Sequence, residues 1–225
     1  DYSQVELRVM AHLSQDEALI EALNNGEDIH TFTAKNIFDI EKDENVLPEM
    51  RRTAKIVNFG IMYGAGPFRL SKELDVPFGE AKKIKDAYFS KYKGIEGYIA
   101  KSKVLIKSEK SVQTLLGRKR AVWDSDSQNK IRRDAAERMA INMPIQGTAA
   151  EMIKLAMIKI YKDLKDKNLK SKLILQVHDE LLLEVHKDEL DYISEMVVKN
   201  MKNAIQLDVP IEIDCGFGPS WFEAH

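Results

Sequence analysis

Apolar side chains recur every three or four residues through most of the first 110 positions, a spacing that predicts amphipathic helices. Ser14 followed by Glu17 forms a capping box, Asp28 is a suitable N-cap, and Pro48 suits a first helical turn. Glycine and proline at 64–67 end the helix that Pro48 begins. We therefore expect helices over residues 5–13, 14–25, 29–38, 49–63, 78–90 and 96–110.

The second half of the chain mixes helical and strand patterns, and Asn142-Met143-Pro144 is expected to interrupt its longest helical stretch. Expected helices cover residues 127–141, 145–165 and 190–205. A strand and turn are expected over residues 114–120, and strands over residues 173–177, 181–185 and 209–215. The total is mostly helix with a small antiparallel sheet, so the predicted fold class is α+β.

Composition is that of a well-solvated globular chain. The 225 residues carry 44% hydrophobic and 31% charged side chains, enough for one large domain or two packed smaller ones. No apolar run is long enough to cross a membrane, and the first residues do not form a signal peptide. Cys215 is the single cysteine, which favours a reducing, cytoplasmic setting and a buried strand position for that thiol.

Charge is strongly segregated although the net charge is only −2. The stretch Lys82–Arg120 contains twelve lysines and arginines, opposed by Asp86, Glu96 and Glu109 alone. Such a block attracts nucleic-acid phosphates through counterion release. A solvated helical face would look much the same, so this pattern alone leaves both interpretations open.

The junction of two apolar strands carries an acidic pair. Asp179 and Glu180 follow His178 between the runs 173–177 and 181–185, where a structural turn would prefer glycine or asparagine. Carboxylates on a rigid hairpin are well placed for metal binding or acid–base chemistry. A plain acidic turn is the alternative.

A stripe of four side chains runs along the helix expected over residues 49–63. Arg51, Lys55, Phe59 and Tyr63 recur every fourth residue and therefore share one helix face. Two cations followed by two aromatic rings suit a nucleoside triphosphate, with phosphates at one end and the base at the other. An ordinary amphipathic helix is the alternative.

Asp1 begins the chain directly before a predicted helix, where backbone N–H groups attract phosphate oxygens. Helix capping is its alternative role. Together, DYSQVELR at 1–8, RRTAKIVNFGIMYG at 51–64 and VHDE at 177–180 resemble motifs A, B and C of the family A DNA polymerases, the bacterial DNA polymerase I type. RMAINMPIQGTAAE at 138–151 and the closing residues 216–225 also resemble that family, so the likeness covers essentially the whole chain.

The resemblance implies a catalytic centre with two Mg²⁺ ions. Asp1 and Asp179 would be their carboxylate ligands, assisted by the backbone carbonyl of Tyr2. Glu180 would support the site as a nearby carboxylate. The expected reaction is template-directed addition of deoxynucleotides to a primer 3′ end by two-metal-ion nucleotidyl transfer.

The resemblance also implies a binding pocket for deoxynucleoside triphosphates. His30, Arg51 and Lys55 would grip the triphosphate, and Lys55 would also protonate the departing pyrophosphate. Phe59 would pack on the incoming sugar and base and disfavour dideoxynucleotides, while Tyr63 would guard the template base. Glu6 would be the steric gate against a ribose 2′-hydroxyl, and Gln4 would line the same pocket.

Primer–template DNA is the other implied partner. The side chains expected to contact it, in the minor groove, at the primer terminus or along the template, are Arg118, Arg120, Arg138, Asn142, Gln146 and His178.

By the same likeness, residues 1–6 would begin the palm, 7–120 would form the fingers, and 121–225 would complete the palm with the motif C hairpin. The chain starts at the catalytic aspartate, so the thumb, the upstream palm strands and any proofreading domain would belong to a missing N-terminal part. Leu47 before Pro48 is a poor helix cap. The isolated chain is expected to bind primer–template weakly and to extend it little or not at all. The expected setting is a bacterial or phage-type cytoplasm.

Two rival functions remain. A single-subunit RNA polymerase shares the architecture, but Glu6 and the triplet His178-Asp179-Glu180 favour DNA synthesis. A nucleic-acid-binding remnant without catalysis is the rival of another class, and the intact motif residues weigh against it.

Overall fold

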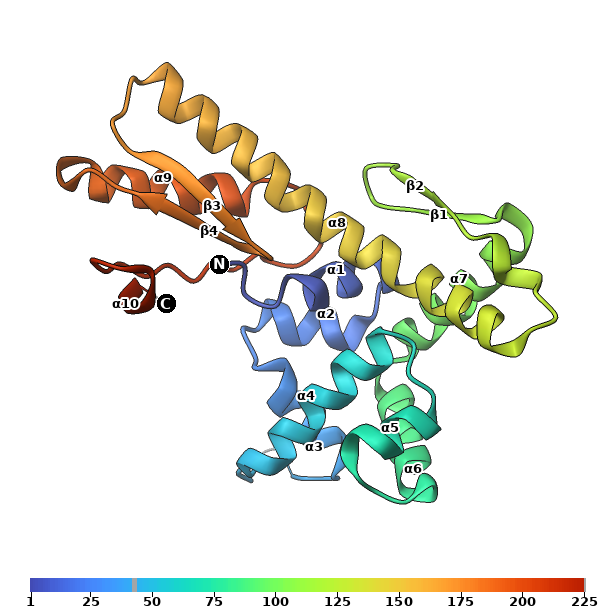
Figure 1. Cartoon of the computed structure of the whole chain (residues 1–225). Helices are drawn as coiled ribbons and strands as arrows, with labels where there is room; N and C mark the ends of the chain where they lie inside the picture. Colours follow the sequence, from blue (N-terminus) through green and yellow to red (C-terminus); the bar gives the residue numbers. More distant parts are fainter. Residues whose placement is uncertain (42–43, 225) are drawn as a thin grey trace. The chain divides into compact units, whose positions relative to one another are not determined.

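The structure is a computed structural model that describes residues 1–41 and 44–224. The final residue of the expected family-like ending, His225, lies outside the described residues. The helices are α1 (Val5–Ser14), α2 (Glu17–Asn24), α3 (Ile29–Ile37), α4 (Pro48–Met62), α5 (Pro67–Leu74), α6 (Phe78–Lys91), α7 (Lys93–Glu109), α8 (Lys130–Asp166), α9 (Leu190–Lys202) and α10 (Trp221–Ala224), with short 3₁₀ turns η1 (Trp123–Asp126) and η2 (Lys187–Glu189). The strands are β1 (Ser111–Gln113), β2 (Lys119–Ala121), β3 (Lys172–Val177) and β4 (Glu180–Glu184) (Figure 1).

Two compact units make up the chain. The terminal unit combines residues 1–9 with residues 147–225, and the central unit comprises residues 10–146. Each unit contains one antiparallel hairpin, β3–β4 in the terminal unit and β1–β2 in the central unit. The described chain is thus mostly helical with two small antiparallel hairpins, which confirms the α+β prediction at that level.

The central unit is held together by buried polar as well as apolar contacts. Asp16 is the N-cap of α2, because its carboxylate accepts the Leu19 amide at 3.0 Å. The same carboxylate accepts the Gly94 amide at 2.7 Å, which ties α2 to the start of α7. Ser14 instead donates to the Ala11 carbonyl inside α1, so the predicted Ser14 capping box was wrong.

A small apolar core supports the β1–β2 hairpin. Buried side chains from α7, β1, α8 and the segment between β2 and η1 form it, namely Ile106, Val112, Val122, Ala136 and Ala140. Strand pairing sets Val112 opposite Arg120, so most of the strand and turn expected over residues 114–120 is the turn of this hairpin, and its strand part begins at Lys119. The burial of Val112 fixes which face of the hairpin points inward.

Helix α5 was not predicted, because glycine and proline at 64–67 were interpreted only as a helix end. Pro67 sits in the first turn of α5, where its missing N–H costs nothing. Leu70 is fully buried and packs against α4 at Gly60, which stabilises α5. A hypothetical Cβ on Gly60 would lie 3.0 Å from Leu70 Cδ2.

Helix α8 is continuous through Pro144, so the predicted interruption at Asn142-Met143-Pro144 was wrong. A proline removes one backbone hydrogen bond from a helix, but packing on either side can compensate. Ile141 and Ile145 are both buried beside it. The Tyr98 hydroxyl also donates to the Ile141 carbonyl at 3.0 Å and so ties the turn before Pro144 to α7.

The predicted strand over residues 209–215 was also wrong. Only one isolated bridge forms there, between Tyr2 and Ile213. Alternating apolar residues do not form a regular strand when the neighbouring segment, here the first residues of the chain, pairs with them over a short stretch only. Cys215 is exposed, which overturns its expected burial.

Candidate functional site

The tip of the β3–β4 hairpin carries the acidic pair. Val177 pairs with Glu180, so His178 and Asp179 alone form the turn. His178 has φ of +51°, a left-handed conformation that costs a non-glycine residue about 1–3 kcal/mol. Its carbonyl accepts the Gln176 side-chain amide at 2.9 Å, which helps hold the strained turn. Backbone strain is therefore located directly beside Asp179.

Backbone hydrogen bonds bring the first residues to this tip. The Tyr2 amide donates to the Asp179 carbonyl at 3.3 Å, so Asp1 and Asp179 lie next to each other. The Asp1 carbonyl accepts the Asp214 amide at 2.9 Å, and the Asp1 amino group donates to the Asp214 carbonyl at 2.8 Å. The Tyr2 ring is buried, and its hydroxyl donates to the Met201 carbonyl at 2.9 Å. Figure 1 shows the N-terminus beside the hairpin.

Arg8 joins the first residues of the chain to the segment around Glu212, and the sequence did not predict this supporting role. Its guanidinium is 4% exposed and donates to the carbonyls of Ser3 (2.9 Å) and Pro210 (2.6 Å) and to the Glu212 carboxylate (2.5 Å). Burial lowers the pKa of Arg8, and the Glu212 carboxylate opposes that effect. The arginine at the end of the motif DYSQVELR was the signal, since an arginine on an apolar helix face needs acceptors when buried.

The oxygen atoms gathered at the tip suit Mg²⁺. Two carboxylates and the Tyr2 carbonyl are hard ligands, and Mg²⁺ is commonly held by one or two carboxylates together with water and substrate phosphates. Over residues 1–41 and 44–224 there is no cluster of three or more His, Cys, Asp or Glu side chains able to hold a metal. The residues present therefore fit a magnesium ion that shares its ligands with a substrate, rather than one in a closed protein cage.

Three other predicted side chains lie around the tip. Gln4 has φ of +54°, and its carbonyl accepts the amides of Leu7 and Arg8, which starts α1. Glu6 lies in the first turn of that helix and is half-buried. Glu180, also half-buried, begins β4.

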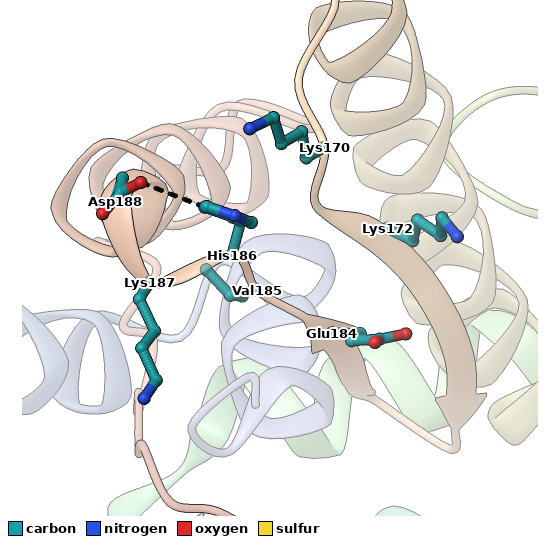
Figure 2. A pocket seen from close by; sticks show the side chains of 7 residues that line it. All are labelled: Lys170, Lys172, Glu184, Val185, His186, Lys187 and Asp188. Atoms are coloured by element: carbon teal, nitrogen blue, oxygen red, sulfur yellow. Dashed lines mark ion pairs between the residues drawn. The ribbon is translucent and has the colours of Figure 1, made fainter.

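Two cavities of the terminal unit border the hairpin, and Glu184, Val185 and Lys187 line both of them. One, of about 940 Å³, is bordered by Asp1, Glu180 and Trp221 and is otherwise lined mostly by apolar side chains of β4, α9 and the C-terminal tail. The other, of about 410 Å³, contains Lys170, Lys172 and the ion pair of His186 with Asp188 at 3.6 Å (Figure 2). Because Lys172 pairs with Glu184 at the far end of the hairpin, this basic cavity is not part of the acidic site.

In the central unit, α4 presents the predicted stripe. Arg51 and Lys55 are exposed, whereas Phe59 and Tyr63 are half-buried. The Phe59 and Tyr63 rings are stacked with centroids 6.3 Å apart and planes 28° apart. The His30 ring lies 5.8 Å from the Phe59 ring. Cations and aromatic rings thus follow one another along one face of α4, and the imidazole of α3 lies beside them.

Arg51 is oriented by a bidentate contact that sequence reasoning missed. Its Nε and Nη2 atoms donate to the two Asp28 carboxylate oxygens at 3.0 and 2.7 Å. Partial burial alone would raise the pKa of Asp28, but hydrogen bonds from Arg51 and Thr31 outweigh it and hold this pKa well below its usual range. Asp28 is also the predicted N-cap of α3, accepting the Thr31 amide at 2.7 Å. The Nη1 edge of Arg51 points away from this contact.

His30 is 4% exposed and is held by a buried chain of hydrogen bonds. Thr33 donates its single hydroxyl proton to Asn58 Oδ1 at 3.1 Å, so the Tyr92 hydroxyl, 2.8 Å away, must donate to Thr33. The Asn58 amide then donates to His30 Nδ1 at 3.1 Å. Nδ1 is therefore an acceptor, and the neutral ring carries its proton on Nε2.

The electrostatic setting agrees with a neutral His30. Burial is the main cause that lowers the His30 pKa from 6.5, and the positive charges of Arg51 and Lys55 lower it further. Asp28 acts in the opposite direction. The imidazole can thus give a hydrogen bond to a phosphate from Nε2 without adding a charge to a site that already has two cations.

The residues expected to meet the DNA minor groove occupy one stretch of α8. Gly64, with φ of +75°, packs against Arg138 so closely that a Cβ there would lie 3.2 Å from Arg138 Cγ. The end of α4, with Tyr63, therefore adjoins Arg138. Asn142 Oδ1 is buried and has no hydrogen-bond partner in the described part of the chain, whereas Gln146 is exposed.

Arg118 and Arg120 lie on the exposed β1–β2 hairpin. Two hydrogen bonds between Arg118 and Thr114 close the turn. The Arg118 backbone N–H donates to the Thr114 hydroxyl at 3.1 Å, and the Arg118 carbonyl accepts the Thr114 backbone N–H at 3.0 Å. The Arg120 side chain is exposed on β2. The hairpin therefore displays its two arginines to solvent.

The predicted residues divide between the two units. The structure brings Asp1, Tyr2, Gln4, Glu6, His178, Asp179 and Glu180 together in the terminal unit, and His30, Arg51, Lys55, Phe59, Tyr63, Arg118, Arg120, Arg138, Asn142 and Gln146 lie in the central unit.

Comparison with known proteins places almost the whole chain in one family. Residues 1–223 match the family described as DNA polymerase family A. The chain belongs to that family. DNA polymerase I of Bacillus subtilis (strain 168) is 47% identical over 224 residues, which are 100% of this chain and 25% of that relative. DNA polymerase I of Caldicellulosiruptor bescii is 45% identical over 223 residues, 99% of this chain and 26% of the relative.

Among solved structures, the family A match extends to the three-dimensional fold. The POL domain of Pol1 from M. smegmatis, in complex with DNA primer-template and dNTP, superposes with a TM-score of 0.96 at 44% identity. The superposition covers 100% of this chain and 39% of the M. smegmatis chain. The chain spans about a quarter of the length of the curated relatives it matches. None of the described helices is both long and apolar enough to cross a membrane.

Proposed function

We propose that this chain carries the nucleotidyl-transfer site of a DNA-directed DNA polymerase, which adds deoxynucleotides to a primer 3′ end under the direction of a template. The observation that carries the proposal is the hydrogen bond from the Tyr2 amide to the Asp179 carbonyl, since it sets two acidic residues 178 positions apart side by side. Membership in family A supports the reaction type.

Asp1 and Asp179 would hold two Mg²⁺ ions, with the Tyr2 carbonyl as a further ligand. When bound, the ions would stabilise the charge that develops on the attacking 3′-oxygen and on the leaving pyrophosphate. The chain itself contributes rigidity, because the Arg8 contacts and the strained His178 turn keep both carboxylates in place before substrate arrives. Glu180 would support Asp179 from the next position.

The nucleotide would lie along α4. Arg51 would meet the triphosphate with its Nη1 edge while Asp28 holds the other edge, and Lys55 would give a proton to the departing pyrophosphate. Neutral His30 would donate from Nε2 to a phosphate oxygen. Phe59 and Tyr63 would stack against the incoming nucleotide and the template base.

Glu6 would exclude a ribose 2′-hydroxyl, and Gln4 would line the same side of the pocket. Arg138, Asn142 and Gln146 would meet the minor groove, whose acceptors look nearly alike for all base pairs, so these contacts test pair geometry. The unsatisfied Asn142 Oδ1 suits such a role, since a buried polar atom otherwise costs free energy. His178 would lie at the primer terminus, and Arg118 and Arg120 would contact the template strand.

In this proposal the palm begins at residues 1–6 and continues over 121–225, and the fingers span 7–120. The POL domain of Pol1 from M. smegmatis was solved with primer-template and dNTP, which supports these as partners of this chain too. A cytoplasmic setting is part of the same proposal.

Single-nucleotide addition to a labelled primer, with the chain in excess over primer–template, tests the function. The complementary deoxynucleotide should be added and the three others should not, and Asp179→Ala should abolish addition while DNA binding is retained. Addition without regard to the template base, or equal activity of Asp179→Ala, would contradict the proposal.

The same assay separates the two rival functions. Glu6→Ala should admit ribonucleotides, and if the unmodified chain already prefers ribonucleotides it is an RNA polymerase. A non-catalytic binding remnant would hold primer–template without adding any nucleotide. That result should be checked by replacing the matching segment of the Bacillus subtilis relative with residues 1–225. An inactive hybrid would show that this chain is a binding remnant without catalysis.

A further inference from the structure

The C-terminal tail touches the acidic tip. Trp221 Nε1 donates a hydrogen bond to Glu180 Oε1 at 2.9 Å, across 41 positions of sequence within the terminal unit. Glu180 directly follows Asp179 and begins β4. An indole N–H is only a donor, so Glu180 Oε1 is the acceptor of this contact and one of the two carboxyl oxygens is held in place. Trp221 also borders the cavity that Asp1 and Glu180 share.

The tail is folded in a way that presents this indole. Ser220 accepts the backbone amides of Glu223 (3.2 Å) and Ala224 (3.1 Å), and its hydroxyl donates to the Glu223 carboxylate at 2.6 Å. Gly216 and Gly218 pass directly beneath this turn. A Cβ on Gly216 would lie 1.8 Å from the Ala224 carbonyl oxygen, and one on Gly218 would lie 2.7 Å from the Glu223 carbonyl carbon. Only glycine permits so close a backbone approach.

The position of Glu180 matters for its neighbour. Two carboxylates one residue apart at a hairpin tip repel each other, and a flexible Glu180 can swing toward any cation that Asp179 binds. A directed hydrogen bond from a partly ordered indole restricts that movement. The hydrogen bond from Trp221 therefore holds the Glu180 carboxyl group against the C-terminal tail.

We propose that Trp221 is a positioning residue of the nucleotidyl-transfer site, which acts through Glu180 to set how Asp179 engages magnesium. This inference rests on the proposed function and deepens it. Trp221 touches neither metal nor substrate in this account. Removing its N–H group while keeping a ring should weaken the response to magnesium and leave the affinity for the nucleotide alone.

The contact itself can be tested without catalysis, by following the indole N–H signals of ¹⁵N-labelled chain. The two tryptophans give two signals, and Trp123→Phe assigns them. Glu180→Ala should move the Trp221 signal, whereas Glu184→Ala, the matched change at the other end of β4, should leave it in place. An unmoved Trp221 signal in Glu180→Ala would overturn the proposal.

Coupling to the metal is tested by the same signal. Mg²⁺ alone should shift the Trp221 signal of the unmodified chain and should not shift it in Asp179→Asn, while the Trp123 signal stays constant in both. A residue with a merely structural role would not report on a distant carboxylate. Equal behaviour of the Trp221 signal in the two proteins would count against positioning.

Activity gives the third measurement. In single-nucleotide addition with the chain in excess, Trp221→Phe should raise the Mg²⁺ concentration for half-maximal rate by roughly three- to tenfold, the loss of one ordinary hydrogen bond. The KM for the nucleotide should stay within about twofold, since Trp221 makes no contact with it in this account. An unchanged magnesium requirement would overturn the proposal.

The failures of the two proposals are distinguishable. If Asp179→Ala still adds nucleotides, or the hybrid with the Bacillus subtilis relative adds none, the proposed function fails and the indole signals alone decide whether Trp221 positions Glu180. If Asp179→Ala is inactive but Trp221→Phe behaves like the unmodified chain, only the Trp221 proposal fails.

Discussion

His30 shows how one buried side chain is prepared for its chemistry. Its Nδ1 accepts from Asn58, which is set in turn by Thr33 and Tyr92. Burial and two nearby cations lower its pKa from 6.5. The ring is therefore neutral and donates from Nε2. Asn58 orients His30 by a hydrogen bond, and Asp28 orients Arg51 in the same way.

The His30 environment predicts a pH-dependent stability. The unfolded chain takes up a proton on this imidazole near pH 6.5, whereas the folded chain resists it, so stability is fully present above that pH and falls below it. The slope from this group is at most about 1.4 kcal/mol per pH unit. Urea unfolding between pH 7.5 and 5.5 should show a smaller loss in His30→Asn than in the unmodified chain. An identical loss in both would contradict the buried neutral state.

Arg51 and its neighbour Arg52 offer a matched pair for the triphosphate contact. Arg51→Ala should weaken binding of a deoxynucleoside triphosphate by roughly 10- to 100-fold, since it removes charge-assisted hydrogen bonds. Arg52 is also exposed but lies about 100° around the helix, so Arg52→Ala should change binding by about twofold or less. Calorimetric titration measures both. Equal losses would show that α4 attracts phosphate by general charge and not through the stripe.

At the level of elements, close packing decides where a helix can tolerate a side chain. Gly94 and Gly97 both lie in α7, but a Cβ on Gly94 would lie 2.6 Å from Asp16 Cα, whereas Gly97 has no described neighbour within 4 Å. The contact at Gly94 also includes the amide that Asp16 binds. The joint between α2 and α7 therefore depends on this one glycine.

Alanine substitution at these two glycines should have opposite effects. Gly94→Ala should lower the free energy of unfolding by about 2–3 kcal/mol through overpacking. Gly97→Ala should raise it by about 0.5–1 kcal/mol, because alanine is the better helix former. Denaturant titration of both variants checks this. Destabilisation of similar size at the two positions would contradict the packing of α2 against α7.

The β1–β2 hairpin should contribute to nucleic-acid binding through charge. Arg118→Ala and Arg120→Ala should each reduce the slope of log K against log salt concentration by about 1 for primer–template binding. Lys162→Ala, an exposed lysine on α8 outside the hairpin, is the control and should leave the slope unchanged. Fluorescence anisotropy across a salt series provides the slopes. If the control lowers the slope as much as the arginines do, the hairpin has no special part in binding.

Local pattern predicted those elements whose signals lie in adjacent residues. Periodicity and caps sufficed for α3 and α4, including the Asp28 cap and the absence of any side-chain cap from Leu47 among the described residues. The stripe on α4 followed from spacing alone, and the pairing of β3 with β4 followed from two apolar runs.

Elements that depend on distant partners were not predictable in this way. Helix α8 continues through Pro144 because of buried neighbours and the Tyr98 hydroxyl, which lies 43 residues from Ile141. The cap of α2 is Asp16 and not Ser14, since only Asp16 also meets α7. The contacts of Arg8 with Pro210 and of Trp221 with Glu180 likewise join segments that no sequence window contains.

At the level of the whole molecule, each unit holds one half of the proposed chemistry. The terminal unit contributes the carboxylates, and the central unit contributes the cations, rings and groove-contacting side chains. The proposed function requires both sets, and the family A match over residues 1–223 covers the segments that carry them. The central claim is therefore that Asp179, with Asp1, makes nucleotide addition depend on magnesium.

The most direct measurement is the rate of Mg²⁺-dependent single-nucleotide addition by Asp179→Asn and Asp214→Asn. Asp214 is the matched control, because it is an exposed aspartate whose backbone pairs with Asp1 and the substitution is the same. Asp179→Asn should slow addition by roughly 1,000-fold, the loss of several kcal/mol of charge stabilisation, and Asp214→Asn should stay within about threefold. Addition by Asp179→Asn at the rate of the Asp214 control would contradict the assignment of the metal carboxylates.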